Sequence, residues 1–316
     1  MLGSYKIRTD LAVEARERFT EENVEVRGVE VREEYNEEKE IRTTVVKITT
    51  ENGARSMGRP QGTYITIESE GLSAPDEDYH REVSEELSRH LRQLIGLEKE
   101  KSVLVVGLGN QAITADSLGP EVVGNLRMTR HLIREYGLKS TSEEALHAIS
   151  GIVPGVMAQT GMETARILLG IIKEVQPDLV IAIDALAARS IRRLGTTIQL
   201  TDTGIHPGSG VGNHRHSLTK ETLGIPVLAI GVPTVVGAAA IVHDTISALL
   251  GVLSSQAETK NTGKWIQNMD PEDQYRLITE LLEPEFGSLY VTPPDIDERV
   301  RQLSFTISEG IHRALF

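Results

Sequence analysis

Residues 103–120 read Val-Leu-Val-Val-Gly-Leu-Gly-Asn-Gln-Ala-Ile-Thr-Ala-Asp-Ser-Leu-Gly-Pro, a short apolar run followed by a glycine-rich turn. Uninterrupted apolar runs of this length are typical of strands that are buried on both faces. Similar runs follow at residues 148–149, 179–183 and 227–230, and helical patterns separate them. The sequence therefore predicts an α/β fold, with a three-layer, mainly parallel twisted sheet and helices on both faces.

The N-terminal quarter of the chain has a different pattern. Leu11, Ala15 and Phe19 are four residues apart, which predicts a short amphipathic helix. Runs rich in β-branched residues between positions 24 and 68 are separated by turn residues, and they predict a small antiparallel β unit. We expect a boundary near residue 75, with the N-terminal helix and β unit in residues 11–75 and an α/β core in residues 76–316.

The composition narrows the classes of function. The 316 residues include 33 Lys and Arg against 46 Asp and Glu, a net charge of −13, which disfavours binding to a nucleic-acid backbone. No apolar run is long enough to span a membrane, and the N-terminus lacks the apolar core of a secretion signal. The chain has no cysteine, which excludes disulfides and thiol catalysis. We expect a soluble, cytoplasmic protein with no direct nucleic-acid or membrane partner.

Two aspartates follow apolar strand residues, where ligands bind in open α/β sheets. Asp116 lies in the turn after residues 103–106, and Asp184 comes directly after residues 181–183. A carboxylate beside apolar strand residues is costly to bury without partners, so both positions are candidates for a functional site. The structural alternative is that each aspartate caps a following helix.

A third candidate is the glycine-rich stretch of residues 201–214. Its members Gly208, Ser209, Gly210 and Gly212 offer exposed backbone amides that could bind an extended peptide or an oxyanion. A linker without a binding role explains the same composition.

Two further alternatives come from short motifs. Residues 107–112 satisfy a loose dinucleotide-binding pattern, but the acidic residue expected about 20 residues later is missing, because that region has a helical pattern. His206, His214 and His216 could bind a metal together with Asp116 or Asp184, although histidines in a surface loop are the more common outcome. We expect neither a cofactor nor a metal.

Several long segments resemble the germination protease family, the spore endopeptidases that degrade small acid-soluble spore proteins. The resemblance covers nearly the whole chain and is carried by five stretches, at residues 5–15, 107–120, 183–189, 201–213 and 231–236. It implies a fold similar to that of hydrogenase maturation endopeptidases. In those relatives an acidic pair helps bind a metal, which leaves a metal-dependent maturation-type endopeptidase as the alternative function.

The resemblance also implies a site and partners. The two essential aspartates of these atypical aspartic peptidases fall on Asp116 and Asp184. The family implies small acid-soluble spore proteins as substrates, a homotetramer, and a location in the forespore and spore core.

A zymogen follows from the N-terminal segment under the same resemblance. Family substrates have the pattern Thr-Glu, an apolar residue, Ala, Ser and Glu, and they are cut after the first acidic residue. Residues 9–14 read Thr-Asp-Leu-Ala-Val-Glu and match that pattern. We therefore expect the protein to cut itself between Asp10 and Leu11, which makes residues 1–10 a propeptide.

Overall fold

The computed structural model describes residues 9–21, 26–73, 77–96, 100–137, 147–208, 216–255, 271–286 and 289–316. Its central element is one mixed sheet of nine strands, in the order β1-β2-β3-β7-β8-β6-β4-β5, with β9 added beside β8. The strands are β1 (Val29–Asn36), β2 (Ile41–Ile48), β3 (Gly62–Glu68), β4 (Ser102–Gly107), β5 (Ala148–Ile152), β6 (Leu179–Ala188), β7 (Thr197–Thr201), β8 (Val227–Gly237) and β9 (Tyr290–Val291).

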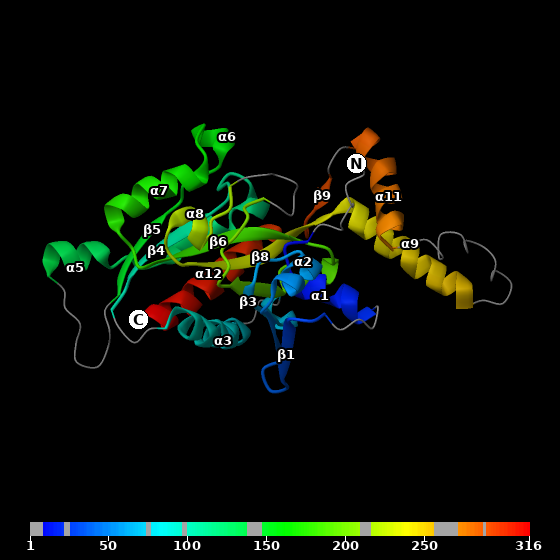
Figure 1. Cartoon of the computed structure of the whole chain (residues 1–316), viewed down its shortest axis with the longest axis horizontal. Helices are drawn as coiled ribbons and strands as arrows, with labels where there is room; N and C mark the ends of the chain where they lie inside the picture. The colour runs from blue at the N-terminus through cyan, green and yellow to red at the C-terminus, as the bar shows by residue number, and fades with distance from the viewer. Residues whose placement is uncertain are drawn as a thin grey trace.

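Helices cover both faces of this sheet (Figure 1). The α-helices are α1 (Ala12–Glu21), α2 (Glu51–Met57), α3 (Glu77–Ile95), α4 (Leu118–Asn125), α5 (Arg130–Tyr136), α6 (Met157–Thr160), α7 (Thr164–Val175), α8 (Lys220–Leu223), α9 (Ala238–Ser255), α11 (Pro271–Phe286) and α12 (Ile296–Leu315). The described residues also form the short 3₁₀ turns η1 (Glu70–Ser73), η2 (Thr114–Asp116) and η3 (Ile191–Arg193).

The parallel block forms because its strands are apolar on both faces. β4 pairs in parallel with β5 and β6, and β6 pairs in parallel with β8. Alternate residues of these strands enter two separate cores, one under α3, α4 and α12 and the other under α1, α7 and α8. The predicted α/β class, with helices on both faces, is confirmed.

The predicted N-terminal antiparallel unit is also confirmed, and it is part of the main sheet. β1, β2 and β3 pair antiparallel with one another, and β3 then pairs antiparallel with β7. β7 pairs antiparallel with β8, so hydrogen bonding is continuous from the N-terminal unit to the parallel block. The division at residue 75 stays a prediction, and residues 1–8 of the expected propeptide lie outside the described residues.

Two helices extend from one end of the sheet. α9 follows β8 directly and packs against α11, and Figure 1 shows both projecting away from the sheet. Among the residues described, no helix has both the length and the apolar character needed to cross a bilayer.

Candidate active site

Asp184 lies inside β6 rather than at its end. Ile181 and Ile183 point into the core under α3, α4 and α12, so strand alternation directs Asp184 to the opposite face. Its side chain is only 5% exposed, and it accepts a hydrogen bond from the backbone N–H of Ala185 at 3.0 Å. β6 continues beyond the predicted end because β8 pairs with it as far as Ala188, across a bulge after Leu186.

Asp116 is held in the loop between β4 and α4, at the end of η2. The backbone N–H of Asn110 donates to the Asp116 carbonyl at 3.0 Å and to its carboxylate Oδ2 at 2.8 Å. Ser117, not Asp116, occupies the N-cap position of α4. The Asp116 carboxylate is therefore bonded to its own loop, and the helix-cap interpretation does not describe it.

The glycines of this loop are explained by close backbone packing. Gly109 has a φ of +110°, and a Cβ there would lie 2.0 Å from the carbonyl oxygen of Asp116. A Cβ on Gly119 would lie 2.6 Å from the carbonyl oxygen of Ile183. Since side chains at these positions would collide with the backbone, the glycines allow the Asp116 loop to lie directly on β6.

Two hydrogen bonds fix the loop over the parallel strands. Leu108 N–H donates to the carbonyl oxygen of Ile183 at 2.8 Å, and the Thr234 hydroxyl of β8 donates to the carbonyl oxygen of Ala115 at 2.7 Å. Asp116 and Asp184 consequently line one cavity of about 220 Å³. The structure thus brings together two carboxylates that are separated by 68 residues along the chain.

The expected cleavage bond lies at the same cavity. Asp10 is among the residues that line it, beside Asp116 and Asp184. Asp10 N–H donates to the carbonyl oxygen of Ala187 at 3.0 Å, and Ala187 N–H donates back to Asp10 Oδ2 at 2.9 Å. Leu11 is fully buried in the core under α1, α7 and α8.

The glycine-rich loop reaches this cavity at its beginning. Gly208 lines the cavity, whereas Ser209, Gly210 and Gly212 lie outside the described residues. Their predicted role in binding a peptide or oxyanion stays a prediction.

The histidines of the loop are separated from one another. His206 lines a smaller neighbouring cavity, where burial and the nearby charge of Arg59 lower its pKa against the opposing effect of Asp10. His216 is exposed and lies 3.3 Å from a carboxylate oxygen of Glu163, and His214 lies outside the described residues. In the described part of the chain, no group of three His, Asp or Glu side chains is arranged to hold a metal ion.

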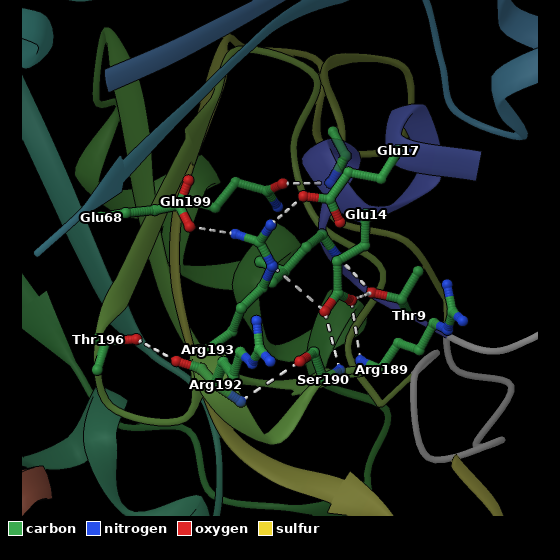
Figure 2. A network of polar contacts seen from close by, with 12 residues as sticks. Thr9, Glu14, Glu17, Glu68, Arg189, Ser190, Arg192, Arg193, Thr196 and Gln199 are labelled. Carbon is green, nitrogen blue, oxygen red and sulfur yellow. Dashed lines mark hydrogen bonds and ion pairs between the residues drawn. The ribbon is translucent and has the colours of Figure 1, made fainter. Parts of the chain in front are cut away.

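A polar network anchors the start of α1 beside the site (Figure 2). The buried carboxylate of Glu14 accepts hydrogen bonds from the Thr9 hydroxyl and from the backbone N–H groups of Arg189 and Ser190. The Arg193 guanidinium, near the centre of Figure 2, forms ion pairs with Glu14, with Glu17 and, at 2.5 Å, with Glu68. This network holds the chain immediately after Asp10 and Leu11.

Two polar residues beside the expected cut could not be identified from the sequence. Gln199 and Arg193 both contact the N-terminal segment, yet neither belongs to a recognisable motif. One signal was available: residues 197–201 read Thr-Ile-Gln-Leu-Thr, in which Gln199 stands between two apolar residues, as expected for a strand. The structure forms β7 there.

Comparison with known proteins identifies the chain's relatives. The family model described as Germination protease matches residues 7–266. A germination protease from Caldanaerobacter subterraneus subsp. tengcongensis is 49% identical over 98% of this chain and 94% of the relative. One from Clostridium perfringens is 43% identical over 98% of this chain and 95% of the relative. Among solved structures, the [NiFe] hydrogenase maturation protease HycI from Thermococcus kodakarensis is 18% identical, with a TM-score of 0.32 over 71% of this chain and 99% of that chain.

The family model and the curated relatives define the class: the protein is a peptidase, and therefore a hydrolase, and its fold is α/β. Within that class, the chain belongs to the germination protease family.

Proposed function

We propose that the protein is a sequence-specific endopeptidase, made as a zymogen that cuts itself between Asp10 and Leu11. The observation that carries this proposal is that Asp10, Asp116 and Asp184 line one cavity. The first belongs to a segment that matches the family's substrate pattern, and the other two are the carboxylates that hydrolysis requires. Asp10 thus forms part of the cavity wall beside the two aspartates, which is the arrangement expected of a zymogen before its own cleavage.

The chemistry is an atypical aspartic mechanism. Two carboxyls in one partly buried cavity do not readily both ionise, so the pair shares one proton and titrates as a unit. The ionised carboxyl removes a proton from water, and the water oxygen bonds to the carbonyl carbon of Asp10. The protonated carboxyl gives its proton to the nitrogen of Leu11 as the C–N bond breaks. The products are a carboxylate on Asp10 and a new amino terminus at Leu11.

The proposal extends to the physiological substrates. We propose small acid-soluble spore proteins as the targets, degraded at germination, in the forespore and spore core. The relatives are named germination proteases, which supports a role in spore germination. The homotetramer expected from the family belongs to the same proposal.

The mechanism is tested by incubating purified wild-type protein, Asp116→Asn and Asp184→Asn and sequencing the N-termini. Asparagine keeps the size of each side chain but cannot transfer the proton, so we expect both variants to lose at least 10²-fold in processing rate. Wild-type protein should begin at Leu11. A variant that processes at the wild-type rate would remove that residue from the mechanism, and a different new terminus would refute the cleavage site.

The alternative, a metal-dependent maturation-type endopeptidase, uses the same two acidic residues. Processing in the presence of a chelator separates the two mechanisms. We expect unchanged rates, whereas loss of processing that added Zn²⁺ restores would establish the metal-dependent mechanism.

A further inference from the structure

The side-chain amide of Gln199 bridges the peptide bond at which we expect cleavage. Its Nε2 donates to the carbonyl oxygen of Asp10 at 3.0 Å, and its Oε1 accepts from the backbone N–H of Ala12 at 2.6 Å. One primary amide, which has both a donor and an acceptor, thus contacts the residue before Leu11 and the residue after it. Figure 2 shows the Gln199 side chain extended toward the start of α1.

Gln199 lies two strands away from Asp184, in the same row of the sheet. In the strand register, Asp184 lies opposite Gly231 of β8, and Gly231 lies opposite Gln199 of β7. The three residues therefore form one row across three neighbouring strands. Since neighbouring strands are about 4.8 Å apart, the Cα atoms of Asp184 and Gln199 are separated by roughly 10 Å.

All three residues of this row face the same side of the sheet. Their sequence neighbours Ile183, Ile198 and Ile230 pack into the core on the other side. The middle position, Gly231, has no side chain, and a Cβ there would lie 2.5 Å from Leu186 Cδ1. The Leu186 side chain therefore lies over the middle of the row, between the Asp184 carboxylate at one end and the Gln199 amide at the other.

The N-terminal segment lies over this row. Asp10 and Leu186 line the cavity that contains Asp184, and they also line the smaller cavity that contains Gln199 and Gly231. Besides Gln199, the backbone of Ala187 holds Asp10, and Arg59 donates to the carbonyl oxygen of Thr9 at 2.5 Å. The bond is held from both sides with its carbonyl oxygen directed at an amide donor.

We infer that Gln199 positions the Asp10–Leu11 bond for self-cleavage and donates a hydrogen bond to the carbonyl oxygen as negative charge develops on it. This inference rests on the proposed zymogen function. The distance of 3.0 Å falls within the range over which a preorganised donor stabilises an oxyanion. Gln199 is 7% exposed, so water competes little for its amide.

The structural alternative is that Gln199 only secures the start of α1 through Ala12. Gln199→Glu separates the two roles, because it keeps an oxygen acceptor for the Ala12 N–H and replaces the donor by a second oxygen. We expect this variant to process about 10²–10³-fold more slowly than wild type at pH 7, the usual cost of losing one such donor. A protonated glutamic acid regains a donor, so its rate relative to wild type should rise as the pH falls toward 4.5.

The measurement is the first-order rate of appearance of the Leu11 terminus at fixed protein concentration, followed by mass spectrometry. Gln93→Glu, on the exposed part of α3, is the charge-matched control and should process at the wild-type rate. If Gln199→Glu does not fold, Gln199→Met, uncharged and of similar length, replaces it and should also slow processing about 10²-fold.

The outcomes separate this inference from the function on which it rests. A folded Gln199→Glu that processes within threefold of wild type would overturn the role of Gln199, while self-cleavage by the aspartates would stand. A slow rate without a relative gain at low pH would also overturn the donor role. Wild-type protein that never yields a Leu11 terminus would overturn both proposals.

Discussion

At the scale of single residues, the site depends on glycines at positions where a side chain would not fit. Gly119 lies in the first turn of α4, at the point where the helix, the Asp116 loop and β6 meet. A Cβ on Gly119 would lie 2.4 Å from the carbonyl oxygen of Leu108 and 2.6 Å from that of Ile183. These two carbonyl oxygens have little freedom to move aside, because they belong to the backbone that holds Asp116 and Asp184.

Gly119→Ala should therefore destabilise the protein and disturb the site. Overpacking usually costs about 1–3 kcal/mol, and contact with backbone places this variant at or above about 3 kcal/mol. The matched control is Gly124→Ala in the same helix, where a Cβ meets nothing within 4 Å. Alanine should stabilise that exposed helical position by about 0.5–1 kcal/mol. Urea unfolding measures both values, and equal stability of the two variants would contradict the packing argument.

At the scale of elements, helix α1 is attached to the rest of the protein by buried polar contacts. Its first turn carries Glu14, which is 2% exposed and accepts hydrogen bonds from the chain after β6. Arg193 neutralises this buried carboxylate and also pairs with Glu17 and Glu68. Burial raises the pKa of Glu68, and Arg193 opposes that rise. One guanidinium thus joins α1, β3 and η3.

Arg193→Ala should loosen α1. Removing one partner of a buried ion pair costs about 3–5 kcal/mol, and the partial exposure of Glu17 and Glu68 favours the lower value. Arg192→Ala is the matched control. The Arg192 side chain is next to Arg193 in the sequence but is exposed, so its removal should change the free energy of unfolding by less than about 0.5 kcal/mol. The free energy of unfolding in urea, with limited proteolysis near residue 21, tests both. Similar losses in the two variants would show that α1 is held by other contacts.

At the scale of the whole molecule, one buried and one half-buried histidine couple stability to pH. His147 Nδ1 accepts a hydrogen bond from Lys101 N–H at 3.0 Å, and His312 Nε2 accepts one from Arg127 N–H at 2.9 Å. A protonated ring nitrogen cannot accept, and burial lowers the pKa of both side chains. The folded pKa values therefore lie below the unfolded value of about 6.5.

The sign of the pH effect follows from this difference. Between the folded and unfolded pKa values the unfolded chain binds more protons, so the stability contributed by these histidines is complete above about pH 6.5 and is lost as the pH falls. We expect the Tm to decrease from pH 7.5 to pH 5.5. The decrease should be smaller in the double variant His147→Gln and His312→Gln, whose amide oxygens accept without titrating. His131→Gln, on exposed α5, should behave as wild type; an unchanged slope in the double variant would contradict the assignment.

The buried parallel strands and the N-terminal antiparallel unit could be predicted from the sequence by itself, and the two aspartates could be named as candidates; α2 (Glu51–Met57) was missed, because residues 51–53 read as a turn. Apolar runs at residues 103–106 and 179–183 indicate buried strands because side-chain periodicity is a local property of the chain. The Gly-x-Gly turn and Asp116 stand next to one such run, so their place at the end of β4 is also encoded locally.

Only the tertiary structure decided which polar groups meet. Asp184, Gly231 and Gln199 form one row because of the register between β6, β8 and β7, and that register depends on packing between residues distant in the chain. Asp10 joins them because Leu11 is buried under the sheet and Arg193 anchors α1. Local periodicity contains no information about such contacts, so the bridge that Gln199 makes across the expected cut could not be read from the sequence.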